Sequence, residues 1–484
     1  MKLSQATVLT AYNGNKNKTA REKNFFYSVW YTVLITVIAY LVWLFDMGIY
    51  GIMFMGALLG VVFATSKDLT PITIIIFEIV QVVSDVNAVV FDAVFIVAVC
   101  IVVVVLVGGM VIHIVRFKPI NKNMRLKGFS VALIACGISI IIGGIDVLPE
   151  RQILPALVIM FYGMVVIFCA LVFNDGLGKN NSERLVRSII YALIASALLA
   201  AVQMFTVLIE LGDVFEAIAS KYEISTGYGY PNYLAYLYTR AIPICVYFAS
   251  KNKKGSCLWL LGAYFFAICI VITSCRAALL MGAIVGVASI VYFGIKTERK
   301  KDFFITIGVL VLITGIGLII IRDEIKSLFA TLFRMGLDSN GRFDLWETGL
   351  ERFIKHPIFG VGIDYDIGGR LDKHPTNTPY TPYWYHNTIV QIMCSLGIIG
   401  CIVFVFYFYR QYRAFALVKK TSVKALMFAL IAIQLISLLD IEFLTPQDFF
   451  QMAVITYGAV QSLPNSQEET FFYKFKKTKK NENQ

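Results

Sequence analysis

Residues 303–321, FFITIGVLVLITGIGLIII, decide the fold, because they form a run of 19 residues without a charge. A helix of this length, at about 1.5 Å per residue, is long enough to cross the ~30 Å hydrocarbon core of a bilayer. In lipid the backbone must satisfy its own hydrogen bonds, which favours a helix over an open strand. Similar runs recur along the chain, in which 58% of the 484 residues are hydrophobic and 15% are charged. This composition is typical of an all-α polytopic membrane protein.

Apolar runs predict about fourteen transmembrane helices. The predicted spans are 25–45, 47–65, 69–85, 87–115, 128–146, 153–173, 188–209, 231–250, 256–274, 277–295, 303–321, 386–409, 422–440 and 447–463. The run 69–85 contains Pro71, Glu78 and Gln81, so it also fits a re-entrant segment.

The basic residues predict the orientation. Of the 43 Lys and Arg residues, 31 lie in alternate connections and at the two ends of the chain: 1–24, 66–68, 116–127, 174–187, 251–255, 296–302, 410–424 and 464–484. The positive-inside rule places these segments in the cytoplasm, with both termini inside and the loop 322–385 outside the plasma membrane. The net charge of +12 is therefore an orientation signal, and we expect no nucleic-acid partner.

Two outer loops, 210–230 and 322–385, are much longer than the others. Long loops in compact proteins are usually functional or disordered. In the second loop, an amphipathic helix is predicted from the spacing of five apolar residues, namely Phe343, Trp346, Leu350, Phe353 and Ile354. Capping residues at 338–340 precede it, and His356-Pro357 ends it. The tail of the loop, 376–385, is rich in aromatic and hydroxyl residues, which suits either sugar rings or an interfacial aromatic belt.

Arg240 lies about nine residues into the span 231–250, near the predicted centre of the bilayer. A charge there is costly unless it faces a cavity or a partner. It is therefore a candidate functional residue, and the alternative is a structural ion pair with Asp92 or Glu78. Pro243, one turn later, could kink the helix.

Two further candidates open predicted helices at the outer face. Arg276 begins the span 277–295, where a cation opposes the helix dipole unless the helix start and the guanidinium together hold an anion such as phosphate. The alternative is a surface arginine that snorkels to the interface. His386 and Asn387 open the span 386–409. Asn387 can cap the helix, and the positive end of the dipole favours the neutral imidazole, which can accept a proton; the alternative is a polar interfacial cap.

The nine cysteines lie mostly in apolar spans and include no C-x-x-C pair. They therefore predict neither a disulfide framework nor a metal site.

Several short motifs between Asn232 and Gly400 resemble those of the O-antigen ligase and polymerase family of bacterial envelope glycan assembly. They are GYPNYLA (229–235), TSCRAA (273–278), GRFDLW (341–346), HPIFGVG (356–362), YHNTIVQ (385–391) and LGIIG (396–400). Each motif is short, but their order and their placement on a protein with many membrane helices make the set specific.

The resemblance implies a glycosyltransferase of the C-type membrane fold that needs no cofactor, metal or nucleotide sugar. Its donor would be a glycan on undecaprenyl diphosphate. Carried over residue by residue, the family pattern assigns the diphosphate to Arg276 and Arg240 and makes His386 the base that activates the acceptor hydroxyl. Arg342 and Asn387 would shape the glycan cleft. We add Asn232, Trp384 and Tyr385 as glycan-binding candidates.

One feature departs from the family. Family members commonly have an Arg a few residues before the Pro-Asn pair, whereas the nearby basic residue here is Lys221. A lysine is a point charge and not a bidentate fork. Lys221 and Arg240 therefore stay alternative diphosphate ligands.

The resemblance predicts three regions: N-terminal membrane helices (1–230), a catalytic membrane region (231–463) and a basic cytoplasmic tail (464–484). The favoured function is polymerisation of lipid-linked repeat units into capsule, exopolysaccharide or O-antigen. The alternatives are a ligase that transfers finished glycan to a terminal acceptor and, less favoured, a flippase for lipid-linked oligosaccharides. Expected partners are the lipid-linked glycan, the acceptor glycan, membrane lipid and other membrane proteins of polysaccharide assembly.

The predicted orientation gives a first test. A cysteine introduced into 322–385 should react with a membrane-impermeant maleimide added to intact cells or spheroplasts, because this loop is predicted to lie outside. A cysteine introduced into 464–484 is the matched control and should react only after permeabilisation. The opposite pattern would reverse the assigned topology.

Overall fold

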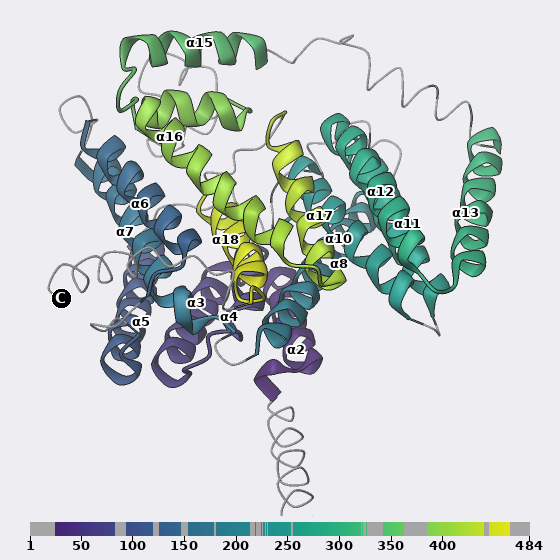
Figure 1. Ribbon diagram of the computed structural model, residues 1–484, viewed down its shortest axis with the longest axis horizontal. Coiled ribbons are helices and arrows are strands. Elements are labelled where there is room, and N and C mark those ends of the chain that lie inside the picture. The colour runs from purple at the N-terminus through teal and green to yellow at the C-terminus, as the bar shows by residue number, and fades with distance from the viewer. Residues whose placement is uncertain are drawn as a thin grey trace, which may run out of the picture.

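The computed structural model confirms an all-helical membrane architecture (Figure 1). It describes residues 25–82, 93–119, 125–146, 153–178, 181–212, 231–252, 255–320, 342–362, 385–439 and 445–464, together with positions 218, 224, 226, 227, 229, 322 and 326. Over these ranges seven helices are long and apolar enough to cross a membrane, and four shorter helices are similarly apolar.

Each of the fourteen predicted spans contains one helix. In chain order these are α2 (Val29–Leu44), α3 (Gly48–Thr65), α4 (Ile72–Glu78), α5 (Ala93–Phe117), α6 (Gly128–Asp146), α7 (Ile153–Gly176), α8 (Ser182–Leu211), α10 (Pro231–Lys251), α11 (Ser256–Ile272), α12 (Arg276–Lys296), α13 (Lys300–Ile320), α16 (Thr388–Leu417), α17 (Thr421–Ile436) and α18 (Pro446–Val460). The short 3₁₀ helix η1 (Phe25–Tyr27) precedes them, and α15 (Arg342–Lys355) lies in the predicted outer loop.

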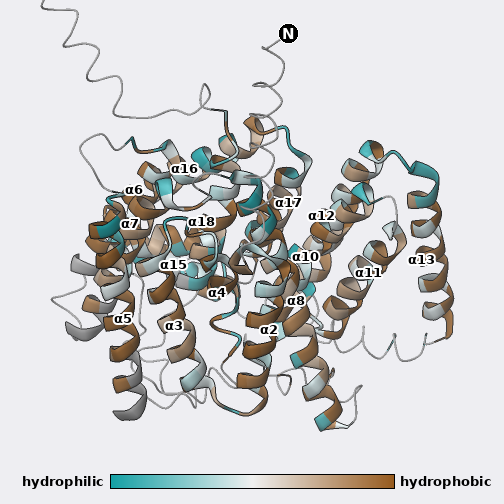
Figure 2. Cartoon of the chain, turned by 90° about the horizontal axis from the view of Figure 1, so that it is seen from below, coloured by the Kyte–Doolittle hydropathy of each residue, from teal (hydrophilic) through white to brown (hydrophobic). Residues whose placement is uncertain are grey.

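The distribution of polarity is that of a protein solvated by lipid. Figure 2 shows hydrophobic residues over the outward faces of the peripheral helices. On α13, for example, Val311, Leu312 and Ile319 are each more than 60% exposed. The interior instead contains buried polar side chains, among them Glu78, Gln203 and Arg240. We infer that the exposed apolar surface contacts the bilayer.

The doubtful run 69–85 is a short, broken helix and not a regular span. Its helix α4 has seven residues, about 10 Å at the usual rise. The segment nevertheless does not turn back within 69–82. Thr73 contacts Ser188 near the start of α8, whereas Gln81 bonds Ser196 and Gln203 further along that helix. It therefore advances alongside α8 in the same direction, which a re-entrant loop would not do.

The direction of the neighbouring helices agrees with this path. Gly56 of α3 packs against Val102 of α5, and Phe63 packs against His113, so α3 and α5 run parallel. The connection between them must return from the end of α3 to the level at which α5 begins. The segment 69–82 is the described part of that return.

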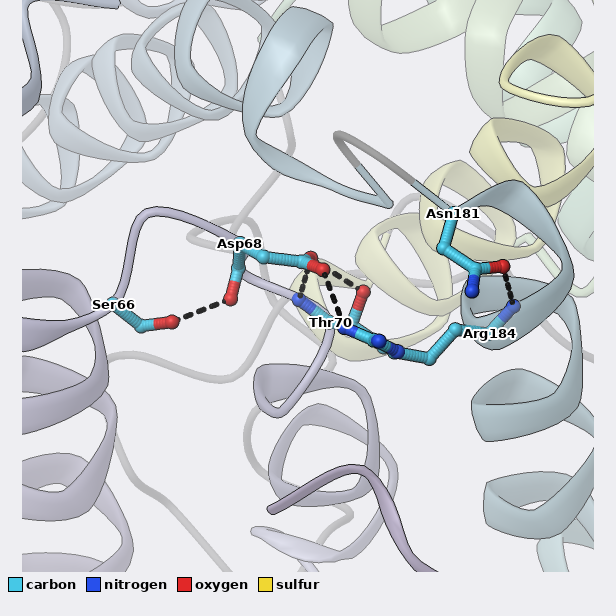
Figure 3. A network of polar contacts seen from close by, with 5 residues as sticks. All are labelled: Ser66, Asp68, Thr70, Asn181 and Arg184. Carbon is cyan, nitrogen blue, oxygen red and sulfur yellow. Dashed lines mark hydrogen bonds and ion pairs between the residues drawn. The ribbon is translucent and has the colours of Figure 1, made fainter. Parts of the chain in front are cut away.

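A polar network fixes the beginning of this segment (Figure 3). The Asp68 carboxylate accepts hydrogen bonds from the backbone N–H and the hydroxyl of Thr70, at 3.1 and 2.6 Å, and pairs with Arg184 of α8 at 3.6 Å. Asn181 caps the same turn of α8 by accepting from Arg184 N at 3.0 Å. The start of α4 is thereby held against the start of α8.

Helix α16 corrects the predicted span 386–409. At Gly397 the backbone leaves the helical region, with φ 64° and ψ −162°. The first part of α16 lies beneath α15, and the second part descends into the bundle (Figure 1). There it runs antiparallel to α6, since Gly143 lies against Leu396 whereas Gly128 lies against Arg410. The membrane-crossing part of α16 therefore follows the kink.

The motif HPIFGVG (356–362) braces this kink through backbone hydrogen bonds. The N–H groups of Val361 and Gly362 donate to the carbonyls that the kink leaves open, and the carbonyls of 357 and 358 accept from the first N–H groups after it. These bonds are Val361 N to Cys394 O at 2.8 Å, Gly362 N to Ser395 O at 2.8 Å, Ile398 N to Pro357 O at 2.8 Å and Ile399 N to Ile358 O at 3.3 Å. A Cβ at Gly360 or at Gly397 would collide with the opposite backbone.

The amphipathic helix forms as predicted, but only part of its apolar face is packed. Phe343, Leu350 and Ile354 are 62%, 42% and 73% exposed, whereas Trp346 packs against Tyr385 and the buried residues of α16. Gly349 is the buried residue of α15, and it packs against Tyr385 and Val390. A glycine lets the two helices approach more closely than a larger apolar residue would, which hydrophobic spacing does not reveal.

The kink can be tested with a pair of glycine substitutions. Gly397→Ala should destabilise the protein by at least ~1–3 kcal/mol, because its backbone conformation is essentially restricted to glycine and its Cβ would meet Ile358 O. Gly315→Ala is the control, because nothing lies within 4 Å of a Cβ there and alanine is a better helix former. Thermal unfolding in detergent should show a lower Tm for the first variant alone. Equal Tm values would show that the brace contributes no stability.

Candidate functional site

The start of α12 has the features of an anion site. Arg276 is its first residue, and the N-cap residue Cys275 makes no side-chain cap hydrogen bond. The first N–H bonded back to the start of the helix is that of Leu279, which donates to Cys275 O at 2.9 Å. The earlier N–H groups point out of the helix end, where the dipole favours a negative charge. An arginine at this place adds a bidentate donor for phosphate.

Ser274 is an addition to the residues predicted from sequence. It is 6% exposed, and its hydroxyl has no hydrogen-bond partner among the described residues. Its φ is 51°, a left-handed conformation that is uncommon outside glycine. Buried hydroxyls are normally hydrogen-bonded, so an open one beside a helix start and an arginine indicates a place for a polar ligand. The sequence shows Ser274 next to Arg276, but neither its burial nor its open hydroxyl.

His386 precedes α16 in a similar way. It is half-buried and also has a left-handed conformation, with φ 52°. The following Asn387 caps α16 by accepting from Ile389 N at 2.8 Å and Val390 N at 3.2 Å. The structure thus confirms the predicted cap. The strained backbone at His386 is a feature that concentrates at functional sites.

The end of α17 positions this histidine. Three donors from α15 and the start of α16 bond three successive carbonyls there: Thr388 N to Ser437 O at 3.0 Å, Asn387 Nδ2 to Leu438 O at 3.0 Å, and Arg342 Nη1 to Leu439 O. These carbonyls belong to the turn 437–439 that directly follows α17, and the helix dipole makes this end attractive to a cation. The outer-loop helix, the helix that follows His386 and α17 are therefore joined at one point.

Arg240 is almost completely buried in the interior, as expected for a charge in the middle of the bundle. Its Nη1 donates to Gln451 of α18, and its guanidinium lies 5.9 Å from the ring centre of Phe77. The neighbouring Thr239 contacts Gly282 of α12, which is six residues, or about 9 Å, along the helix from Arg276. Arg240 therefore lies deeper in the bundle than Arg276. Its described contacts are with Gln451 of α18 and Phe77 of α4.

The glycan-binding candidates differ in their placement. Asn232 lies half-buried in the first turn of α10. Tyr385 is fully buried, and its hydroxyl accepts from Arg352 Nη1 at 3.2 Å and from Cys394 Sγ at 3.0 Å. Burial leaves no free ring face for a sugar, so its contacts fit a role in holding α15 against α16. Lys221 and Trp384 lie outside the described residues.

Helix order brings Arg276 and His386 to the same end of the bundle. In Figure 1, α17 lies between α16 and α12, and α12 joins α13 at the lower end and so begins at the upper end. The first half of α16, which follows His386, also lies at that upper end. This is the end predicted to be extracytoplasmic.

Comparison with known families agrees with this arrangement. Residues 261–405 match the family model described as O-antigen ligase. The matched region includes Ser274, Arg276, Arg342 and His386, and it ends just beyond the kink at Gly397. Arg240 and Asn232 precede it, so the O-antigen ligase match begins later than the resemblance in the sequence suggested. No curated protein matches the chain.

This match supports a function of the O-antigen ligase or polymerase type in polysaccharide assembly. It leaves the individual roles of the site residues as predictions.

Ser274 gives a direct test of the anion site. Ser274→Ala should weaken binding of an undecaprenyl-diphosphate glycan by about 10- to 100-fold, since a hydrogen bond to a charged group contributes ~1.5–3 kcal/mol. Its stability should be unchanged, because the hydroxyl has no partner among the described residues. Microscale thermophoresis and thermal unfolding would measure the two effects.

Ser289→Ala is the matched control on the same helix. The Ser289 hydroxyl is buried and donates to Gly286 O at 2.8 Å, so its loss should leave binding unchanged. Equal affinities for wild type and Ser274→Ala would exclude the serine from the site.

Proposed function

We propose that this protein polymerises undecaprenyl-diphosphate-linked oligosaccharide units into a surface polysaccharide at the outer face of the plasma membrane. The observation that supports this best is the start of α12, where an open buried hydroxyl, an arginine and the N–H groups of a helix end are adjacent. This combination suits a diphosphate. A second helix start, with a histidine in a strained conformation, lies at the same end of the bundle.

In the proposed reaction, the His386 imidazole accepts the proton of an acceptor hydroxyl. The hydroxyl oxygen attacks the anomeric carbon of the donor sugar as the bond between that carbon and the phosphate oxygen breaks. The electron pair of the broken bond leaves with the lipid diphosphate. Arg276 and the start of α12 stabilise the charge that develops there.

A diphosphate is a good leaving group, so positioning, charge stabilisation and one base account for the chemistry without a metal. Arg240, deeper in the bundle, is proposed as a second positive charge near the donor, with Lys221 as the alternative. Arg342 and Asn387 act at the acceptor side by holding the start of α16 against α17.

The second candidate is a ligase, favoured by the description of the matched family. Both activities use the same donor and the same bond-breaking step, and they differ in the acceptor. Purified protein supplied only with lipid-linked repeat units should form a ladder of products if it is a polymerase. If it is a ligase, it should form no ladder and should transfer glycan only after a terminal acceptor such as lipid A core is added.

Substitutions at His386 separate chemistry from backbone strain. His386→Gly and His386→Asn both suit a left-handed conformation, so both variants should fold and insert normally. Each should lose roughly 10²–10⁴-fold in rate of glycan extension, because a general base contributes about that much. Product ladders from purified protein in nanodiscs provide the measurement. Extension at the wild-type rate in either variant would exclude His386 as the base.

Arg276→Ala should abolish extension while the protein still inserts into the membrane. Arg276→Lys should keep part of the activity, because it retains the charge but not the bidentate geometry. The length distribution of the cell-surface polysaccharide and immunoblotting of membranes would report the two properties. Wild-type chain lengths in Arg276→Ala would contradict the proposed grip on the diphosphate.

A further inference from the structure

An apolar cavity of about 350 Å³ lies among α10, α11, α12 and α13. Its walls are almost entirely hydrophobic. Leu279, Ala283 and Val287 of α12 line one side, and Leu310, Val311 and Thr314 of α13 line another. A space with such walls suits an apolar chain.

Helix α13 forms a loosely attached wall of this cavity. Figure 1 shows it at the edge of the molecule, beyond α11 and α12. Phe303, at its beginning, is its one buried residue. A hydrogen bond of 2.9 Å joins Thr314 to Tyr264 of α11. Because the Thr314 hydroxyl already donates to Leu310 O, Tyr264 is the donor.

The cavity is aligned with the anion site. Leu279, Ala283 and Val287 follow Arg276 by 3, 7 and 11 residues, so they share its face of α12. The row extends for about 16 Å along the helix axis. A cation and a helix start therefore stand at one end of an apolar groove, as required for an amphiphile with an anionic head.

Small residues on α12 make the groove wide. Ala278, Gly282 and Gly286 all line it, and a Cβ at Gly286 would meet only Ile242, at 3.8 Å. The small side chains at these three positions leave room for a chain with methyl branches, while Leu279 and Val287 form the bulkier part of the same wall.

We propose that this groove, between α12 and α13, receives the polyprenyl chain of the donor while its diphosphate lies at Ser274 and Arg276. The inference rests on the proposed function, because that function supplies the polyprenyl carrier. The groove holds the first isoprene units after the diphosphate, and the rest of the chain continues into the bilayer past α13. The hydrogen bond between Thr314 and Tyr264 joins α13 to α11 beside this passage.

Photolabelling tests the groove independently of catalysis. The full-length protein would be placed in nanodiscs of phosphatidylethanolamine and phosphatidylglycerol with undecaprenyl phosphate that carries a diazirine within the first isoprene units. After irradiation, mass spectrometry should find the label on the groove faces of α12 and α13. Unlabelled undecaprenyl phosphate should compete, and an equal excess of phosphatidylglycerol should not.

Two adjacent substitutions on α12 provide the matched pair. Ala283→Phe fills the groove and should reduce labelling roughly tenfold, because several methylene groups of the chain lose their buried place. Ile284→Phe adds a ring at the next residue, which is 50% exposed and does not line the groove. It should label as wild type does. If Ala283→Phe fails to fold, the map of labelled residues in wild type decides alone.

The outcomes separate this inference from the proposed function. Three results would overturn the polyprenyl assignment: label outside the groove, equal labelling of the two variants, or competition by phosphatidylglycerol. Competition by phosphatidylglycerol would indicate a general site for acyl chains. His386→Gly should keep full labelling while it loses glycan extension. If this variant keeps both labelling and glycan extension, His386 is not the base, whereas the assignment of the groove is unaffected. If wild type extends glycans but shows no label in the groove, the assignment of the groove is wrong, whereas the proposed function is unaffected.

Discussion

The arrangement of the outer end depends on one constraint: backbone polar groups that a helix break leaves open must be hydrogen-bonded within the protein when no water is present. The break at Gly397 opens carbonyls at 394 and 395 and N–H groups at 398 and 399, and the segment 357–362 bonds all four. The carbonyls of Leu438 and Leu439, in the turn after α17, are bonded in the same way by α15 and the start of α16. These hydrogen bonds join the outer-loop helix α15, the break at Gly397 and the residues before α16 into one unit. This unit fixes the position of His386.

The same constraint accounts for the placement of charge. A guanidinium in lipid is stable only beside polar or aromatic partners, and Arg240 has Gln451 and Phe77. Arg276 instead begins a helix at the end of the bundle and is half-buried. The two guanidinium groups are therefore stabilised in different ways. The deeper one is held mainly by the protein, and the shallower one has a helix start and an open hydroxyl beside it.

The sequence predicted what depends on length and local chemistry. Runs of apolar residues identified every helix of the bundle, and Asn387 identified the start of α16, because hydrophobic length and capping are local properties. The kink at Gly397 was missed, because the sequence does not show whether a glycine in an apolar run has a negative or a positive φ. The contribution of Gly349 to the packed face of α15 was missed because it depends on the fit of this residue against Tyr385. Ser274 was passed over because an unsatisfied hydroxyl can be recognised only when its surroundings are known.

A residue with a left-handed backbone conformation precedes both helix starts, and this strain can be related to the proposed chemistry. Ser274 and His386 have φ values of 51° and 52°, and each stands two residues before the first residue of a long helix. A residue in this conformation turns the chain sharply, so that the helix begins abruptly. The cost, about 1–2 kcal/mol for each residue, is offset by the packing of the helices that follow. Two abrupt helix starts at the same end of the bundle suit the proposed lipid-linked donor, whose diphosphate must lie at the boundary between lipid and water.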